Sequence, residues 1–117
     1  MKYFIELRER PFLAIKNGTK KVEGRVPNND DDIYQKIKQG DQIELENETS
    51  LEMIVVEVEF VHKYPDVATM LRSEDPKNVL SSEPKTVEHG VESFNTFTGY
   101  KENVVKYGVY AIGIKNV

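Results

Sequence analysis

The chain has 117 residues and carries 20 acidic against 16 basic side chains, so its formal net charge is −4. This acidity disfavours a protein that binds duplex DNA through bulk charge, and the length predicts one domain, residues 1–117. No cysteine is present, and the two histidines, His62 and His89, form no HxH or HxxxH pair. Disulfides and thiolate sites are therefore excluded, and we expect no metal and no cofactor.

The N-terminus has charged residues at its second and sixth positions, Lys2 and Glu6, and lacks the apolar run of a signal peptide. No segment approaches the roughly 18 apolar residues that a membrane span requires. We therefore expect a cytoplasmic protein that does not enter a membrane. Nothing in the sequence indicates an oligomeric state.

The first half of the chain alternates short extended and short helical patterns. Pro11 suits the first turn of a helix, Asn17-Gly18 suits its end, and Asp32 is placed to cap a later helix. The predicted elements are a strand at Tyr3–Leu7, a helix from Pro11 to Lys16, a strand at Lys21–Val26, a polar loop from Pro27 to Asp32 and a short helix at Ile33–Ile37.

The second half begins with a turn at Gly40-Asp41 and then alternates in the manner of a β-hairpin. The predicted elements are strands at Gln42–Glu46 and Leu51–Val61, a helix at Val67–Leu71 opened by Pro65-Asp66, an irregular polar stretch over residues 73–90, a helix at Val91–Phe97 and a last strand at Tyr107–Ile114. About five strands without regular βαβ alternation predict an α+β fold, a small and mostly antiparallel β-barrel with short peripheral helices.

The segment from Gly18 to Arg25 is the most informative stretch of the chain. If residues 22–26 are extended, Lys21, Glu23 and Arg25 share one face of the strand, because side chains alternate between faces. Such a row suits an anionic or polar planar ligand, and it is equally typical of the salt-bridged, solvated face of a surface strand. Lys20 and Glu23, three residues apart, can meet only if Lys20 belongs to the turn after Gly18; otherwise Lys21 is the lysine of the site. Neither Lys20 nor Glu23 is expected in the core.

Charge and aromatic residues add two further indications. Residues 2–25 hold seven Lys or Arg residues against three Glu residues, which predicts a local basic wall on an acidic protein. Tyr100 and Tyr107 are candidates for stacking on a base, although Tyr107 also begins an alternating strand and could be a core residue. Phe94 and Phe97, spaced i and i+3, are expected to be core residues of a helix.

The pattern Gly18-x-Lys20-x-x-Glu23-x-Arg25 resembles the core motif of the ASCH family, a group within the PUA-like superfamily. The resemblance extends over nearly the whole chain, because the motif is followed by the Gly40-Asp41 turn, a hydrophobic hairpin and a closing aromatic strand at 107–112. It implies a PUA-like barrel with a cleft beside the motif that accepts RNA or a nucleoside or nucleotide. Lys21, Arg25, Tyr100 and Tyr107 would then contact the ligand.

The same resemblance carries an alternative, because some small ASCH proteins are amidohydrolases that deacylate N4-acetylcytidine with a lysine, a threonine and a glutamate. Carried over, the lysine is Lys20, and the threonine position is occupied by Glu23. A carboxylate cannot replace a hydroxyl nucleophile, but Glu23 could activate water as a general base. The second carboxylate would be Glu83, or else Glu88. The two hypotheses, a binding module and an amidohydrolase, thus predict the same cleft.

Overall fold

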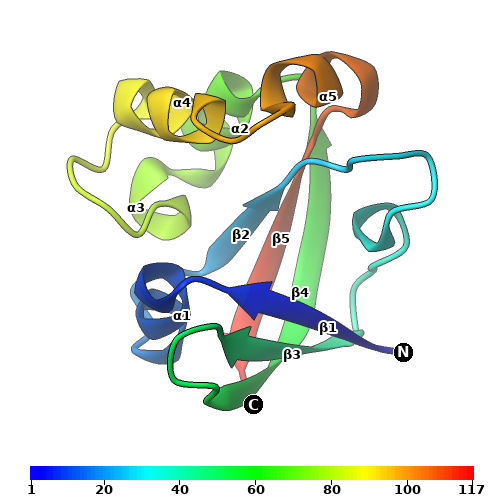
Figure 1. Cartoon of the computed structure of the whole chain (residues 1–117), viewed down its shortest axis with the longest axis vertical. Helices are drawn as coiled ribbons and strands as arrows, with labels where there is room; N and C mark the ends of the chain where they lie inside the picture. The colour runs from blue at the N-terminus through cyan, green and yellow to red at the C-terminus, as the bar shows by residue number, and fades with distance from the viewer.

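The structure, a computed structural model, describes residues 1–117 and consists of one five-stranded sheet with short helices around it (Figure 1). The elements in chain order are β1 (Lys2–Leu7), α1 (Glu9–Lys16), β2 (Val22–Arg25), the 3-10 helix η1 (Ile33–Gln35), β3 (Gln42–Asn47), β4 (Met53–Tyr64), α2 (Val67–Glu74), α3 (Pro76–Val79), α4 (Val87–Asn95), α5 (Tyr100–Tyr107) and β5 (Val109–Asn116). No helix has the length and apolar character needed to cross a membrane.

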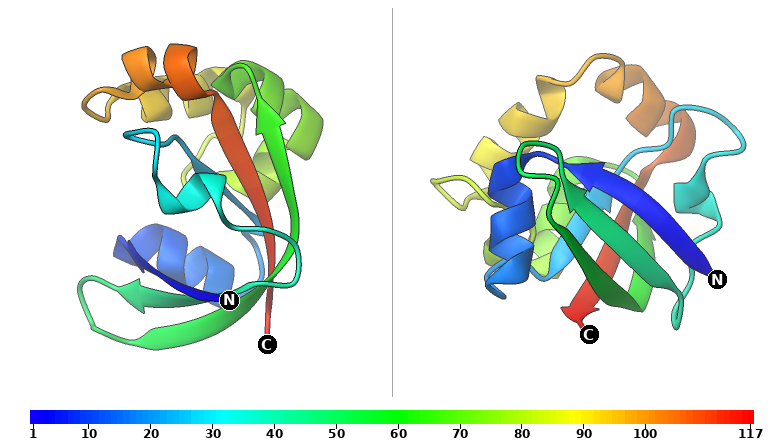
Figure 2. Two further views of the ribbon diagram at one scale, coloured as in Figure 1. Left: turned by 90° about the vertical axis from the view of Figure 1, so that its right-hand side faces the viewer. Right: turned by 60° about the horizontal axis from the view of Figure 1, so that its bottom comes forward.

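The strands follow the spatial order β1-β3-β4-β5-β2. The β1–β3 pair is parallel, and the other three pairs are antiparallel. Strands β1 and β2 are the two edges of a sheet that curls into a half-barrel, as the side view in Figure 2 shows. The predicted α+β fold, with a mostly antiparallel sheet and short peripheral helices, is confirmed, with a curled sheet in place of a fully closed barrel.

The curl is produced by β4, which serves two neighbours in succession. Its first part, Met53–Glu57, pairs with β3, whereas its longer part, Val56–Tyr64, pairs with β5. The register with β5 shifts between Val58 and Phe60, as at a β-bulge. A bulge bends and twists the strand that carries it, so the two halves of the sheet turn toward each other.

Two hydrophobic clusters lie on the opposite faces of the β2–β5 pair. In β5, Ile112 and Ile114 join the cluster that contains Phe12 of α1, whereas Val109 and Ala111 join the cluster beneath α2, α3 and α4. The pairing of Glu23 with Ile112 and of Arg25 with Tyr110 places the charged side chains of β2 on the first of these faces. The motif therefore lies at the boundary between the cluster that contains Phe12 and the cluster beneath α2, α3 and α4.

Capping explains why two helices begin where the sequence predicts. Asp32 caps η1 within a capping box, in which its backbone N–H donates to Gln35 Oε1 at 2.9 Å. Asp66 caps α2 by accepting from the Thr69 backbone N–H at 2.7 Å. Both predicted helix starts are confirmed, and α2 continues beyond the predicted end to Glu74.

The stretch 73–90 was predicted to be irregular, and this is wrong. It contains α3, which begins with Pro76 and is capped by Asp75, and the start of α4, which is capped by Thr86. The predicted helix at 91–97 accordingly lies earlier, at Val87–Asn95, and Phe97 falls beyond its end. Polar capping residues in a proline-containing segment resemble a loop in composition, and tertiary packing selects the helices.

The prediction of a last strand from Tyr107 is also wrong at its start. Tyr107 is the final residue of α5, and β5 begins only at Val109, after Gly108 with its φ of 77°. Helix α5 has a weak apolar pattern, and only Tyr100 and Val104 of its residues pack against the second cluster. Periodicity alone therefore gave no signal for this helix.

Gly113 in β5 is required by a close approach across the sheet. It pairs with Phe60 of β4, whose ring lies directly over the glycine, so a Cβ atom there would overlap three ring carbons. An aromatic ring that covers a strand glycine compensates for the missing side chain.

We expect Gly113→Ala to lower the free energy of unfolding by about 1–3 kcal/mol, because the added methyl group displaces the Phe60 ring from a packed position. Urea unfolding of the single variants and of the double variant Gly113→Ala/Phe60→Leu measures the coupling. The double variant should lose less than the sum of the single losses, since the smaller leucine leaves room for the methyl group. Strict additivity would contradict the proposed overlap.

Candidate functional site

The turn after α1 decides which lysine belongs to the site. Gly18 has a φ of +85°, and the backbone N–H groups of Thr19 and Lys20 both donate to the Ala14 carbonyl at 3.0 Å. This arrangement keeps Lys20 outside β2, which begins at Val22. Lys20 is therefore free of the strand alternation that would direct it away from Glu23.

The Lys20 ammonium group is buried and fully engaged. Its Nζ lies 3.1 Å from Glu23 Oε1 and donates to the backbone carbonyls of Val22, at 2.9 Å, and Val79. Only 6% of Lys20 is exposed. Three acceptors match the three N–H donors of an ammonium group, so the buried charge is both paired and completely hydrogen-bonded.

Glu23 connects Lys20 to Arg25. Its second oxygen, Oε2, accepts from Arg25 Nε at 2.7 Å, while Arg25 Nη1 donates to the Tyr34 hydroxyl at 3.1 Å. Burial by itself raises the pKa of Glu23, but the positive charges of Lys20 and Arg25 outweigh it and hold the pKa below 4.5. Glu23 is thus an anion clamped between two cations.

An aromatic group covers the other side of the site. The ring of Tyr100 stacks on Phe94 with centroids 5.5 Å apart and meets Phe97 edge-on at 5.1 Å. Burial raises the pKa of the Tyr100 hydroxyl, although the charge of Arg25 acts in the opposite direction. Tyr100 is therefore a neutral hydroxyl and a flat apolar surface close to a guanidinium group.

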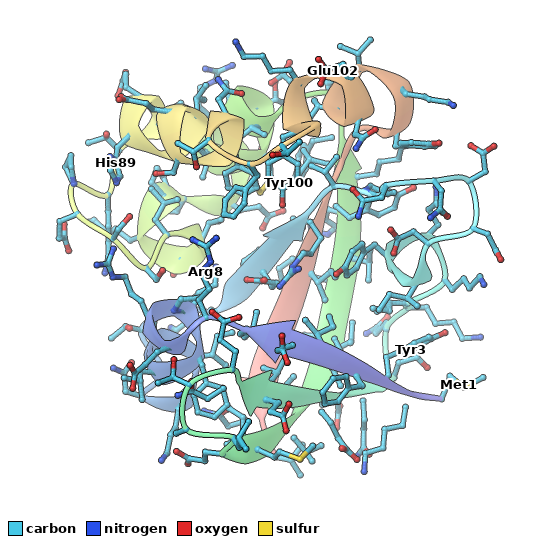
Figure 3. All side chains as sticks on the ribbon, in the orientation of Figure 1. Met1, Tyr3, Arg8, His89, Tyr100 and Glu102 are labelled. Atoms are coloured by element: carbon cyan, nitrogen blue, oxygen red, sulfur yellow. The ribbon has the colours of Figure 1, made fainter.

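These groups line one cleft of about 710 Å³. Lys20, Glu23, Arg25 and Tyr100 all contribute to its wall, together with Arg8 and Arg10 from the junction between β1 and α1. Figure 3 shows Arg8 on the α1 side of the opening and Tyr100 on the α4–α5 side. The cleft thus combines an ion-paired floor, an aromatic wall and a mouth with two arginines.

The other residues predicted for the site lie outside this cleft. The Lys21 side chain is exposed, and its backbone N–H donates to the Asn78 carbonyl at 2.8 Å. Glu83 is also exposed, with Lys85 Nζ 3.7 Å from its Oε1, and Glu88 is exposed on the first turn of α4. Tyr107 lines a separate surface pocket beside Lys106. The structure therefore brings Lys20, Glu23, Arg25 and Tyr100 together and leaves these four apart.

Several residues of the cleft were not singled out from the sequence. Phe97, predicted to be a core residue, is 43% exposed and lines the cleft, because α4 ends before it. Ser82 also lines the cleft, and its Oγ is 2.9 Å from His89 Nε2. The arginines at positions 8 and 10 belong to the basic segment 2–25, which was the available signal. No group of three or more acidic or histidine side chains is arranged to hold a metal ion.

The expectation that neither Lys20 nor Glu23 lies in the core is wrong, since only 6% and 8% of these residues are exposed. We therefore predict that Lys20→Met destabilises the protein by about 3–5 kcal/mol, the cost of breaking a buried ion pair from one side. Chemical denaturation measures the loss. Lys2→Met, which breaks the exposed 2.8 Å pair with Glu44, should cost less than about 1 kcal/mol. Equal losses in the two variants would refute the structural role of Lys20.

The lowered pKa of Glu23 makes a second prediction, on the pH dependence of stability. A carboxylate whose pKa is depressed on folding stabilises the native state above its ordinary pKa of 4.5, and this contribution disappears as the pH falls through the lower, native value. The thermal midpoint of the wild type should therefore exceed that of Glu23→Gln by a constant amount above about pH 5, and the gap should narrow below it. Glu57→Gln, at an exposed pair with Lys115, should show little gap at any pH.

Comparison with solved structures shows which proteins share this fold. The hypothetical protein PH0355 is 35% identical, with a TM-score of 0.85 and full coverage of both chains. Protein PF0455 from Pyrococcus furiosus is 32% identical, with a TM-score of 0.76 over 100% of this chain and 98% of the other. An ASCH domain from Lactobacillus crispatus is 10% identical, with a TM-score of 0.68 over 98% and 79% of the two chains, and shows likeness of fold alone.

No functionally curated protein matches the sequence significantly. A family model described as "ASCH domain" matches residues 5–117, which include the turn, β2, the aromatic group and the closing strand. The match covers nearly the whole chain and agrees with the fold and with the resemblance carried by the Gly18–Arg25 motif. The chain therefore belongs to the ASCH domain family.

Proposed function

We propose that this protein binds single-stranded RNA or a nucleotide, with a base held in the cleft between Tyr100 and Arg25. The observation that carries the proposal is the meeting of the Phe94–Tyr100 stack with the Arg25 guanidinium group in one cleft. Aromatic faces and arginine planes are the surfaces on which proteins stack unpaired bases. A cleft of about 710 Å³ also lies within the usual size range of ligand sites.

The charges of the cleft favour local recognition over general attraction to nucleic acid. The protein as a whole carries a net charge of −4, whereas the cleft is lined by four cations and three carboxylates. Within that set, Lys20 forms an ion pair with Glu23 and donates hydrogen bonds to two backbone carbonyl groups. Arg25 uses Nε and Nη1 inside the protein and keeps Nη2 for a ligand acceptor. We infer that few phosphates contact the protein.

The amidohydrolase alternative has less support from the geometry. Every N–H of the Lys20 ammonium group has an acceptor within the protein, so none is left to contact a substrate. A general base works best with a pKa near the operating pH, but the pKa of Glu23 is lowered. Glu83, the predicted second carboxylate, is exposed away from the cleft. These three facts favour a binding role for the Lys20–Glu23–Arg25 row.

The proposal is tested by the fluorescence anisotropy of short labelled single-stranded RNAs over a range of salt concentrations. We expect binding with a salt dependence equivalent to about two to four phosphate contacts, at a slope of roughly −0.7 each, and weaker binding of duplexes. Tyr100→Leu should weaken binding by about tenfold, because it removes a stacking surface worth about 1–3 kcal/mol. Arg25→Ala should reduce both affinity and salt slope.

The control for these variants is Lys115→Ala, a change in the exposed last part of β5 that should alter binding little. Equal losses in Arg25→Ala and Lys115→Ala would indicate diffuse attraction and would overturn the cleft as the RNA site. Incubation of the wild type with N4-acetylcytidine distinguishes the amidohydrolase alternative from the binding role. Turnover above the buffer blank that is lost in Lys20→Ala and Glu23→Gln would replace the binding module with an amidohydrolase.

A further inference from the structure

We propose that Arg8 and Arg10 form a phosphate subsite at the mouth of the cleft, so that the ligand is phosphorylated and a free nucleoside is a poor substitute. This inference rests on the proposed function, because it assumes that the base lies against Tyr100. It goes further by naming the chemical group that the cleft recognises beyond the base.

Both arginines are held on a rigid part of the chain. Arg8 follows Leu7, the buried last residue of β1, and is the N-terminal cap residue of α1 in an extended conformation. Arg10 lies in the first turn of that helix, which is anchored by the fully buried Phe12. Because a strand and a helix fix the backbone on either side, the two side chains start from defined positions in the cleft wall.

Neither arginine forms an ion pair with a carboxylate of the protein. The structure contains nine ion pairs, and Arg8 and Arg10 take part in none of them. Instead, the Arg8 guanidinium group lies over the ring of Phe97, 5.2 Å from the ring centroid. A cation–π contact orients the guanidinium plane and leaves its N–H donors available, which is the arrangement needed for bidentate binding of a phosphate.

Two carboxylates of the same cleft limit what this subsite can accept. Glu6 and Glu48 also line the cleft, and neither forms an ion pair within the protein. They would repel a dense run of phosphates, whereas one phosphate in contact with both arginines gains two charge-assisted partners. We therefore assign one phosphate group to this mouth, either the terminal phosphate of a mononucleotide or a phosphodiester of RNA.

The experiment compares the four ribonucleosides, their 5′-monophosphates and a short single-stranded RNA by isothermal titration calorimetry. The monophosphates should bind about tenfold more tightly than the nucleosides, or better. The double variant Arg8→Gln/Arg10→Gln should lower the monophosphate affinity to that of the matching nucleoside. Arg10→Gln alone, which leaves the Arg8–Phe97 contact in place, should produce part of that loss. The matched control is Arg72→Gln, at an exposed arginine of α2 outside the cleft.

The different ligands and variants of this experiment distinguish failure of the phosphate subsite from failure of the proposed function. Equal affinity for nucleosides and monophosphates, or equal effects of Arg10→Gln and Arg72→Gln, would overturn the phosphate subsite and leave the base site standing. Loss of RNA binding in the double variant, without measurable binding of monophosphates, would support the subsite with a phosphodiester as its occupant. If nucleosides, monophosphates and RNA all fail to bind the wild type, the proposed function and the subsite are both refuted.

Discussion

The buried ammonium group of Lys20 is the constraint on which the site depends. Its three acceptors come from the side chain of Glu23 and from the backbone of β2 and α3, so one charge joins segments 59 residues apart in sequence. Removing a charge from water is costly unless its partners are well placed, and here all its donors are satisfied. Once Lys20 is fixed, Glu23 is oriented by it, Arg25 is oriented by Glu23, and Tyr34 closes the row.

The contacts from Lys20 to Tyr34 divide the residues of the cleft into two groups. One group holds the cleft together through contacts within the protein, and the other keeps its polar groups available for a ligand. Lys20 has used all three of its donors within the protein, each oxygen of Glu23 has one cationic partner, and Arg25 has used part of its donors. Three other residues of the cleft keep their polar groups free, namely Tyr100, Arg8 and Arg10. Their hydroxyl and guanidinium groups form neither hydrogen bonds nor ion pairs with protein side chains. Residues of a motif that are obvious in a sequence can therefore form the framework of a cleft, while neighbouring side chains keep polar groups free of protein partners.

Most of the strands could be predicted from the sequence, because alternation over β3 and β4 and the turn at Gly40-Asp41 are local signals, but the start of β5 and the parallel pairing of β1 with β3 could not. The sequence also identified the row from Lys20 to Arg25. It did not reveal α5 or the position of Phe97, because a weakly apolar helix is stabilised by packing that is distant in sequence. The burial of Lys20 was equally hidden, since its acceptor at Val79 belongs to a helix in a segment that reads as a loop. Local patterns thus specify elements, and long-range contacts specify the site.

The position of β2 at the edge of the sheet has a consequence for self-association. An edge strand presents unpaired backbone groups that can recruit a strand from another molecule. Here the Val22 carbonyl is occupied by the Lys20 ammonium group, and the neighbouring Lys21 N–H donates to the Asn78 carbonyl of α3. A Cβ atom added at Gly24 would lie 3.0 Å from Phe94 Cζ and 3.2 Å from Met70 Cε, so side chains of α4 and α2 closely cover the middle of this strand. The contacts of Lys20 and Lys21 with α3 therefore hinder strand addition at the β2 edge, on the side of the sheet where Lys20 also lines the cleft.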